Sequence, residues 1–264
     1  MIEITSPFDP RVSDYSLLKS KEENPKIFIA DHEKSVIRLL NSNLEVKSIY
    51  STSKYINKHS ELIYKKLESN KIYHSDINVF EKTIGFSVHQ GMMAVGFTPL
   101  MNNYTILNSP IVLCNSLVDS QNLGSIIRTC GAFGITSIII DEKCVSPYLR
   151  RSIRVSMGNL FFMNFLRSIH ILPDLKKYKD LGFKILGLSL PSNNHENQNK
   201  FCKIGEFEFP EKYILILGNE SKGIDEEVKK ECDQFIYIPM YSGVDSLNVS
   251  HSLAVALSFW KKGL

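Results

Sequence analysis

The sequence predicts an α/β protein with two domains, of which the second is built on a buried parallel sheet. Short apolar segments rich in Ile, Leu and Val alternate with amphipathic helical segments along most of the chain. This alternation indicates sheets covered by helices. From Pro110 onward the strand-like segments are almost continuously apolar, which is typical of strands buried on both faces of a parallel sheet.

The first hundred residues predict a small α/β domain over 1–98. Its expected strands are 26–32, 46–52, 71–75 and 91–98, and its expected helices are 33–42, 54–69 and 79–82. The segment 98–110 is polar, contains two prolines and follows a completed strand. We therefore expect a linker at 99–109.

The rest of the chain, 110–264, predicts a doubly wound domain of five or six strands. The expected strands are 111–117, 136–141, 160–165, 184–190, 213–218 and 234–240, and the expected helices are 122–134, 172–182, 225–232 and 248–262. Ligands of such sheets bind at the carboxyl ends of the strands, so the loops at those ends are where a site is expected.

The charge of the chain is small in total but uneven in distribution. The sequence has 31 basic and 28 acidic side chains, a formal net charge of +3. Residues 143–184, however, contain nine basic and only two acidic side chains. Such an excess can bind a polyanion, although for a basic run in isolation a solvated helical face is the more common explanation.

Several classes of protein are disfavoured by composition. No stretch approaches the ~18 uninterrupted apolar residues of a membrane helix. The N-terminus lacks the basic and then apolar layout of a signal peptide. Five cysteines without a CxxC pair argue against a disulfide framework or a zinc cluster. We expect a cytoplasmic protein that does not bind membranes and has no metal site.

The first loop of interest runs from Asp119 into a helical segment. Asn122 lies where strand gives way to helix and is a candidate N-cap. Arg128 lies four residues after Gly124, on the same face of the helix. Because the helix is otherwise apolar on most sides, we expect Arg128 to have a definite partner.

The second loop follows the strand 213–218. Its two glycines, Gly218 and Gly223, indicate a backbone that approaches a flat ligand closely, with Glu220 as an acidic group at the edge of the sheet. The phosphate-binding spacing GxxxxGK[ST] fails, because Lys222 precedes Gly223, and GxGxxG is absent too. Hydrolysis of a nucleoside triphosphate is therefore disfavoured.

The third loop lies between a strand that stops at Pro239 and the last helix. Ser246 or Asn248 opens that helix, and in isolation the alternating Ser246, Asn248 and Ser250 would suggest plain capping. At the end of a parallel sheet, however, the free backbone N–H groups of a helix start can face a ligand.

Together the three loops resemble the signature motifs of the SpoU branch of the SPOUT methyltransferases, which methylate the 2′-hydroxyl of ribose in RNA. The matching strings are QNLGSIIRTCGAFGI, LILGNESKGI and IPMYSGVDSLNVSHSLAVAL, in the expected order. The resemblance implies a deep trefoil knot in the domain 110–264 and a homodimer that packs through it. More weakly, residues 1–98 resemble the small ribosomal-protein-like α/β domain that many members use to hold RNA.

The resemblance also implies roles for individual residues. Those implied in catalysis are Asn122, Arg128, Glu220, Ser246 and Asn248. Those implied in binding S-adenosylmethionine are Ser189, Leu190, Leu217, Gly218, Asn219, Gly223, Ile238, Pro239, Met240 and Leu247. Arg128 would engage the target ribose and phosphate, and the basic residues Arg150, Arg151 and Arg154 would add RNA contacts. Asn159 stands where the family often has a small residue.

Two alternatives to an RNA methyltransferase remain. One is an RNA-binding protein that kept the fold and lost catalysis, although the polar set is complete. The other is an oxidoreductase in which Asp141, at the end of a strand, binds a ribose, but the glycine fingerprint for that class is missing. Ribosomal and transfer RNA substrates share these motifs, so the motifs do not separate the two.

Overall fold

The computed structural model describes the whole chain except residues 17–24, 102–105, 192–199, 243, 245 and 262–264. Two compact units are present. Unit 1 comprises Met1–Pro99 and Pro147–Phe162, and unit 2 comprises Leu100–Ser146 and Met163–Leu264. The sequence-based domains differ from these units at 147–162, which we had expected within the second domain. Residues 102–105 of the expected linker lie outside the described residues.

Unit 1 contains a five-stranded mixed sheet in the order β1-β4-β3-β5-β2. The strands are β1 Ile2–Glu3, β2 Ile27–Asp31, β3 Val46–Thr52, β4 Ile72–Ser75 and β5 Met92–Phe97. The α-helices are α1 Ser13–Ser16, α2 Glu33–Asn41, α3 Ser53–Lys58, α4 Ser60–Lys66 and α5 Ile77–Ile84. Strand β5 pairs antiparallel with β2 and β3, whereas β4 pairs parallel with β1 and β3.

The single helix expected at 54–69 is wrong, because the chain breaks at His59 into α3 and α4. His59 has φ −121° and ψ 23°, outside the helical region. Its ring Nε2 lies 2.6 Å from Oε1 of Glu33, at the start of α2. The break therefore accompanies a tertiary contact that local periodicity does not contain.

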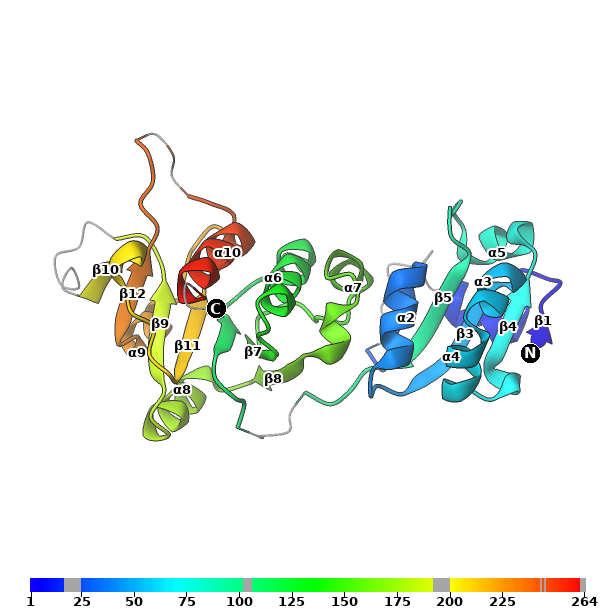
Figure 1. Cartoon of the computed structure of the whole chain (residues 1–264), viewed down its shortest axis with the longest axis horizontal. Helices are drawn as coiled ribbons and strands as arrows, with labels where there is room; N and C mark the ends of the chain where they lie inside the picture. The colour runs from blue at the N-terminus through cyan, green and yellow to red at the C-terminus, as the bar shows by residue number, and fades with distance from the viewer. Residues whose placement is uncertain (17–24, 102–105, 192–199, 243, 245, 262–264) are drawn as a thin grey trace. The chain divides into compact units, whose positions relative to one another are not determined.

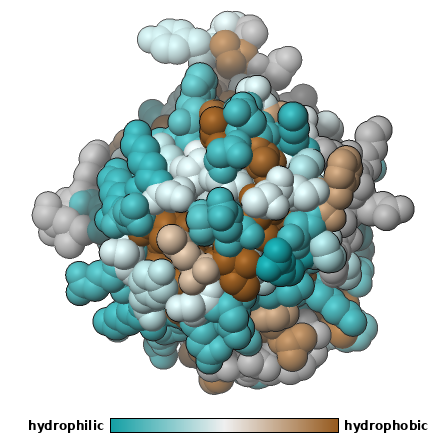
Figure 2. Space-filling view, turned by 90° about the vertical axis from the view of Figure 1, so that its right-hand side faces the viewer, coloured by the Kyte–Doolittle hydropathy of each residue, from teal (hydrophilic) through white to brown (hydrophobic). Residues whose placement is uncertain are grey.

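The core of unit 1 is aromatic. The ring of Tyr50 lies 5.3 Å from that of Tyr15 and 4.7 Å from that of Phe80, and all three side chains are buried. Both tyrosine hydroxyls hydrogen-bond to serine hydroxyls, at 2.9 Å to Ser48 and 2.8 Å to Ser75. On the face of unit 1 that Figure 2 shows, hydrophilic side chains surround and separate smaller hydrophobic areas.

The segment 147–162 packs on unit 1 through aromatic and charged contacts. It contains α7 Arg150–Val155 and the 3₁₀ turn Asn159–Phe162. Phe28 of β2 lies 5.2 Å from the ring of Tyr148 and 5.4 Å from that of Phe161. Burial of these rings, together with the ion pair described next, explains why the segment groups with unit 1.

Arg150 binds a buried carboxylate of unit 1. Its Nη2 lies 2.8 Å and its Nε 2.9 Å from Oδ2 of Asp31, whose side chain is only 2% exposed. The guanidinium also lies over the ring of Phe86, 4.8 Å from its centroid. Oδ1 of Asp31 has no hydrogen-bond partner among the described residues, so Arg150 is the main compensation for this buried charge.

We predict that Arg150→Met destabilises unit 1 by about 2–3 kcal/mol, because it leaves the Asp31 carboxylate buried and unpaired. The matched control is Arg154→Met on the same helix, where the arginine is exposed and the cost should be near zero. Urea unfolding of both variants measures the difference. Equal midpoints for the two variants would contradict a structural role for Arg150.

Unit 2 contains a seven-stranded sheet in the order β10-β12-β9-β11-β6-β7-β8, and all its strand pairs are parallel. This confirms the expected α/β class with a parallel sheet. The strands are β6 Ile111–Cys114, β7 Ser137–Asp141, β8 Asn164–Ser168, β9 Lys184–Leu188, β10 Phe201–Lys203, β11 Tyr213–Leu217 and β12 Gln234–Tyr237.

Two strands of unit 2 differ from the sequence-based prediction. The strand expected at 160–165 is wrong, since Asn159–Phe162 is a 3₁₀ turn and the strand β8 begins only at Asn164. Gly158, with φ +78°, directly precedes this turn, and Phe161 packs on Phe28. The short β10 was not expected at all, because three residues carry no periodic signal.

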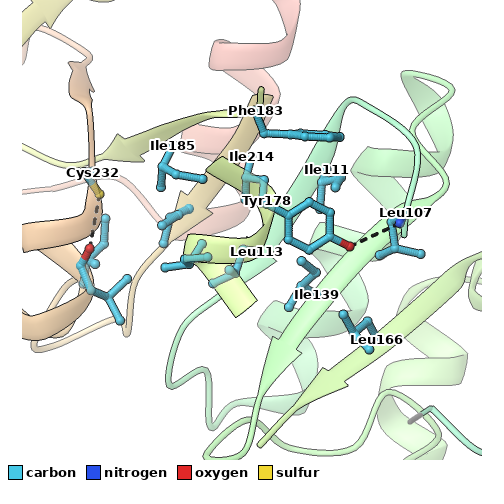
Figure 3. Close-up of a cluster of buried hydrophobic side chains, with 14 of the residues drawn as sticks. Leu107, Ile111, Leu113, Ile139, Leu166, Tyr178, Phe183, Ile185, Ile214 and Cys232 are labelled. Atoms are coloured by element: carbon cyan, nitrogen blue, oxygen red, sulfur yellow. Dashed lines mark hydrogen bonds between the residues drawn. The ribbon is translucent and has the colours of Figure 1, made fainter. Parts of the chain in front are cut away.

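Helices cover both faces of the sheet of unit 2. They are α6 Ser120–Ala132, α8 Ile171–Asp180, α9 Glu226–Glu231 and α10 Val249–Trp260. Helices α8 and α9 pack on one face, through Tyr178 and Val228 among others (Figure 3). Tyr178 also accepts a hydrogen bond from the backbone N–H of Leu107 at 3.2 Å. Strand residues directed to the other face, such as Val112 and Leu215, are buried as well. The two remaining helices, α6 and α10, contact each other (Figure 1).

Within the described residues, no helix combines the length and the apolar composition needed to cross a bilayer.

Candidate active site

Unit 2 has a cavity of about 630 Å³ at the carboxyl ends of β9, β11 and β12. Its walls come from these strand ends, from the loops that follow them and from the first turn of α10. Of the ten residues predicted to bind a cofactor, Pro239 does not line the cavity. The nine that line it are Ser189, Leu190, Leu217, Gly218, Asn219, Gly223, Ile238, Met240 and Leu247. The sequence thus located the cavity, while the binding role of these residues stays a prediction.

The wall after β11 is made of closely packed backbone. A Cβ atom on Gly218 would lie 2.2 Å from the carbonyl carbon of Gly223 and 2.3 Å from the nitrogen of Ile224. Asn219 and Gly223 exchange two backbone hydrogen bonds of 2.9 Å, and Gly223 has φ +72°. Only glycine at 218 permits this doubled-back loop.

The side chain of Asn219 fixes the same loop from inside. Its Oδ1 accepts from the backbone N–H groups of Ser221 at 3.0 Å and Lys222 at 3.1 Å. Its Nδ2 donates to the backbone carbonyl of Ser116, after β6, at 2.8 Å. The loop is therefore anchored to a neighbouring strand end.

Three predicted catalytic residues form a line of side-chain hydrogen bonds. Nδ2 of Asn248 donates to Oδ1 of Asn122 at 2.8 Å, and Nδ2 of Asn122 donates to Oε1 of Glu220 at 2.7 Å. Glu220 and Asn248 line the cavity. Beside the cavity, the first hydrogen bond joins residues that are 126 positions apart in the sequence, and the second joins residues that are 98 positions apart.

The N-cap assignments are partly corrected. Asn248 caps α10, because its Oδ1 accepts from the backbone N–H of Ser250 at 2.9 Å. The candidate cap Asn122 is wrong: Asp119 caps α6 by accepting from the backbone N–H of Gln121 at 2.7 Å. This leaves the amide of Asn122 for Glu220 and Asn248.

Arg128 is exposed, and the expectation of a definite partner is wrong. Among the described residues it makes no hydrogen bond or ion pair. It lies six residues beyond Asn122 on α6, about 9 Å along the helix axis. Ser246 is also exposed and lines the cavity. Three of the five predicted catalytic residues, Glu220, Ser246 and Asn248, therefore line the cavity, Asn122 is hydrogen-bonded to two of them, and Arg128 projects from α6.

The remaining predicted RNA contacts lie in unit 1. Arg151 and Arg154 are exposed on α7, whereas Arg150 is committed to Asp31. Asn159 begins the 3₁₀ turn after Gly158 and is partly exposed.

A polar cluster at the ends of β6 and β7 was not predicted. Asp141, considered above only as a ribose ligand, is buried, and its carboxylate accepts from Nδ2 of Asn115 and the backbone N–H of Ser116, both at 2.8 Å. It also accepts from the backbone N–H groups of Lys143 and Cys144. The carboxylate thus holds two strand ends together. The sequence signal that could have predicted this cluster is the presence of polar residues at the ends of two buried strands.

Asp225 joins this cluster from the loop after β11. Its Oδ2 accepts from Nζ of Lys143 at 2.8 Å and from Oγ of Ser116 at 3.0 Å. The hydrogen bond from Lys143 is the main reason that the pKa of Asp225 is lowered below its usual value, with Ser116 and Asn115 adding to the effect. The same bond raises the pKa of Lys143.

Among the described residues, no group of three or more His, Cys, Asp or Glu side chains is arranged to hold a metal ion.

The fold and the site define a class: a parallel α/β protein with a cavity at the carboxyl ends of its strands. The family model described as the SpoU rRNA Methylase family matches residues 109–258. The chain belongs to this family, as the three loops indicated. All five predicted catalytic residues fall within the matched range.

Curated relatives extend over nearly the whole chain. An uncharacterized tRNA/rRNA methyltransferase of Mycobacterium bovis is 25% identical and covers 98% of this chain and 91% of its own. The 23S rRNA (guanosine(2553)-2′-O)-methyltransferase RlmP of Bacillus subtilis is 26% identical and covers 97% of each. These relatives span both units.

Solved structures share the fold at lower identity. An S-adenosylmethionine-bound rRNA methyltransferase from Sinorhizobium meliloti has a TM-score of 0.82 at 20% identity, over 99% of this chain and 98% of its own. A structure described as an RNA 2′-O ribose methyltransferase has a TM-score of 0.76 at 21% identity, over 98% of each chain.

We predict that Gly218→Ala lowers the thermal midpoint by roughly 5–10 °C, because the new methyl overlaps backbone that cannot rotate away. Gly205→Ala is the matched control in the same unit, since a Cβ there meets only the Phe259 ring at 3.9 Å. Calorimetric melting compares the two. A Gly218→Ala midpoint equal to that of Gly205→Ala would contradict the tight contact.

Proposed function

We propose that this chain transfers a methyl group from S-adenosylmethionine to the 2′-hydroxyl of a ribose in RNA. The observation that carries the proposal is the hydrogen-bonded line Asn248–Asn122–Glu220 beside the backbone-walled cavity, in a member of the SpoU family. RlmP, a relative that covers 97% of this chain, is a ribosomal RNA 2′-O-methyltransferase by its name.

The cavity fits S-adenosylmethionine in size and in chemistry. Its volume lies within the range of about 300–1,000 Å³ usual for small-molecule sites. Leu217, Ile238 and Leu247 supply apolar surface for a flat base. When bound, the cofactor supplies a methyl group already activated by its sulfonium.

The task left to the protein is to align an oxygen with that methyl group and to remove a proton. Glu220 and Asn248 are held rigidly by Asn122, so their remaining polar atoms are available at fixed positions beside the cavity. Ser246 lies at the same rim. We assign these groups to orienting the ribose.

Arg128 is assigned to the developing negative charge on the ribose oxygen. An arginine stays protonated above pH 12 or so, so it is a poor base on its own. An exposed guanidinium without an internal partner is free to bind a phosphate of the RNA and to stabilise the alkoxide as the proton leaves. The exposure of Arg128 on α6, which contradicts the expectation of a fixed partner within the chain, supports this role.

The non-catalytic alternative has no observation in its favour. The polar residues of the three motifs are all present, and three of them are already hydrogen-bonded to one another. The curated relatives are named as methyltransferases.

The proposal extends to the family's architecture and RNA contacts. We infer that unit 2 forms the deep trefoil knot and the homodimer of SpoU enzymes, and that unit 1 is a ribosomal-protein-like domain that holds RNA. The exposed Arg151 and Arg154 remain candidate RNA contacts. The supports are family membership over 109–258 and the fold shared over both units with the solved structures.

We predict that Arg128→Ala keeps S-adenosylmethionine binding but loses at least about 100-fold of methyl transfer to RNA, the scale of removing one transition-state donor. Lys176→Ala, which removes an exposed charge from α8, is the control and should transfer normally. Tritiated methyl incorporation into RNA from cells that lack the protein is the measurement. Undiminished transfer by Arg128→Ala would remove Arg128 from the mechanism.

We also expect the purified protein to sediment as a dimer of its 30.1 kDa chain at micromolar concentration. The measurement is sedimentation velocity over a tenfold concentration range. A single species of monomer mass throughout would contradict the proposed assembly while leaving the fold unaffected.

A further inference from the structure

Ser116, directly after β6, has all its polar groups engaged by three residues from two other segments, the end of β7 and the stretch after β11. Its backbone N–H donates to Asp141 Oδ2 at 2.8 Å, its Oγ donates to Asp225 Oδ2 at 3.0 Å, and its carbonyl accepts from Asn219 Nδ2 at 2.8 Å. Its φ of 59° is a left-handed conformation that a non-glycine residue seldom adopts. Such a conformation persists only where the surroundings fix it.

The partners of Ser116 bracket the loop that walls the cavity. Asn219 is the second residue of the loop 218–224, and Asp225 directly follows the loop. The backbone N–H of Asp225 also donates to Oδ1 of Asn115 at 2.7 Å. The loop is therefore tied at both ends to the same two residues after β6, while Glu220 in its middle receives the hydrogen bond from Asn122.

We propose that Ser116 and Asp225 are positioning residues, which act through the loop 218–224 to set the shape of the cofactor cavity. Neither residue lines the cavity. The inference rests on the proposed function for its catalytic consequence, but the anchoring of the loop is independent of any ligand.

We attribute the anchoring of Asp225 to the hydrogen bond from Ser116 and not to the ion pair with Lys143. The Lys143 side chain is 58% exposed, and an ion pair this accessible contributes little. Ser116 is 9% exposed and the Asp225 side chain is 31% exposed, so their hydrogen bond is better shielded from water than the ion pair with Lys143. An asparagine at 225 retains an oxygen that can accept from Ser116, whereas an alanine does not.

The test compares Asp225→Ala, Asp225→Asn, Ser116→Gly and Lys143→Met by calorimetric titration with S-adenosylmethionine. We expect Asp225→Ala and Ser116→Gly to raise Kd about tenfold, through the loss of one shielded hydrogen bond. Asp225→Asn and Lys143→Met should stay within about threefold of the unsubstituted protein. Ser116→Gly also relieves the left-handed backbone, so its effect does not come from added strain.

Two further readouts separate positioning from general destabilisation. In steady state, KM for S-adenosylmethionine should rise in Asp225→Ala while kcat at saturation changes less than about threefold. In the protein without ligand, amide exchange should accelerate in 218–224 and stay unchanged in β12. The matched control is Glu226→Gln, the next residue along, whose side chain is 80% exposed and pairs only with Lys229 among the described residues.

Unchanged exchange in 218–224 together with an unchanged Kd in Asp225→Ala and Ser116→Gly would overturn the proposal. An Asp225→Asn variant as weak as Asp225→Ala would overturn the assignment to the Ser116 bond. If the unsubstituted protein bound no S-adenosylmethionine, the proposed function would fail, and the exchange comparison would still decide the anchoring.

Discussion

The site of unit 2 depends on one steric constraint, the contact between the backbone at Gly218 and the backbone at Gly223 and Ile224. The strand β11 ends there, and the chain doubles back at a distance that no Cβ permits. The two hydrogen bonds between Asn219 and Gly223 form only because of that approach. The part of the cavity wall that follows β11 is thus held by backbone contacts and does not depend on side-chain rotamers.

The same doubled-back loop explains why position 122 carries an amide. Asn122 must donate to the carboxylate of Glu220 and accept from the amide of Asn248. An aspartate could only accept, and it would face Glu220 with a like charge, whereas a leucine could do neither. The residue type thus follows from two neighbours that lie far away in the sequence but are fixed by the loop and by the start of α10.

The features that the sequence predicted correctly depend on residues close together in the chain, and those that it missed depend on contacts between distant segments. Apolar strand segments and the three loops at their ends follow from composition and spacing, and they located nearly all the residues that line the cavity. The break at His59, the turn at Gly158 and the partner of Arg150 each depend on a contact with a distant element. Asp31 and Arg150 are 119 residues apart, and no periodicity within either segment could pair them.

The same reasoning changes the meaning of the basic segment 143–184. Three of its nine basic side chains pair with acids outside it, namely Lys143 with Asp225, Arg150 with Asp31 and Lys179 with Glu231. Arg167 donates instead to the backbone carbonyls of Glu142 and Cys144. The excess counted along the sequence is therefore partly neutralised in space. Under the proposed function, attraction to a polyanion falls to arginines such as Arg128 and Arg154, which have no partner among the described residues.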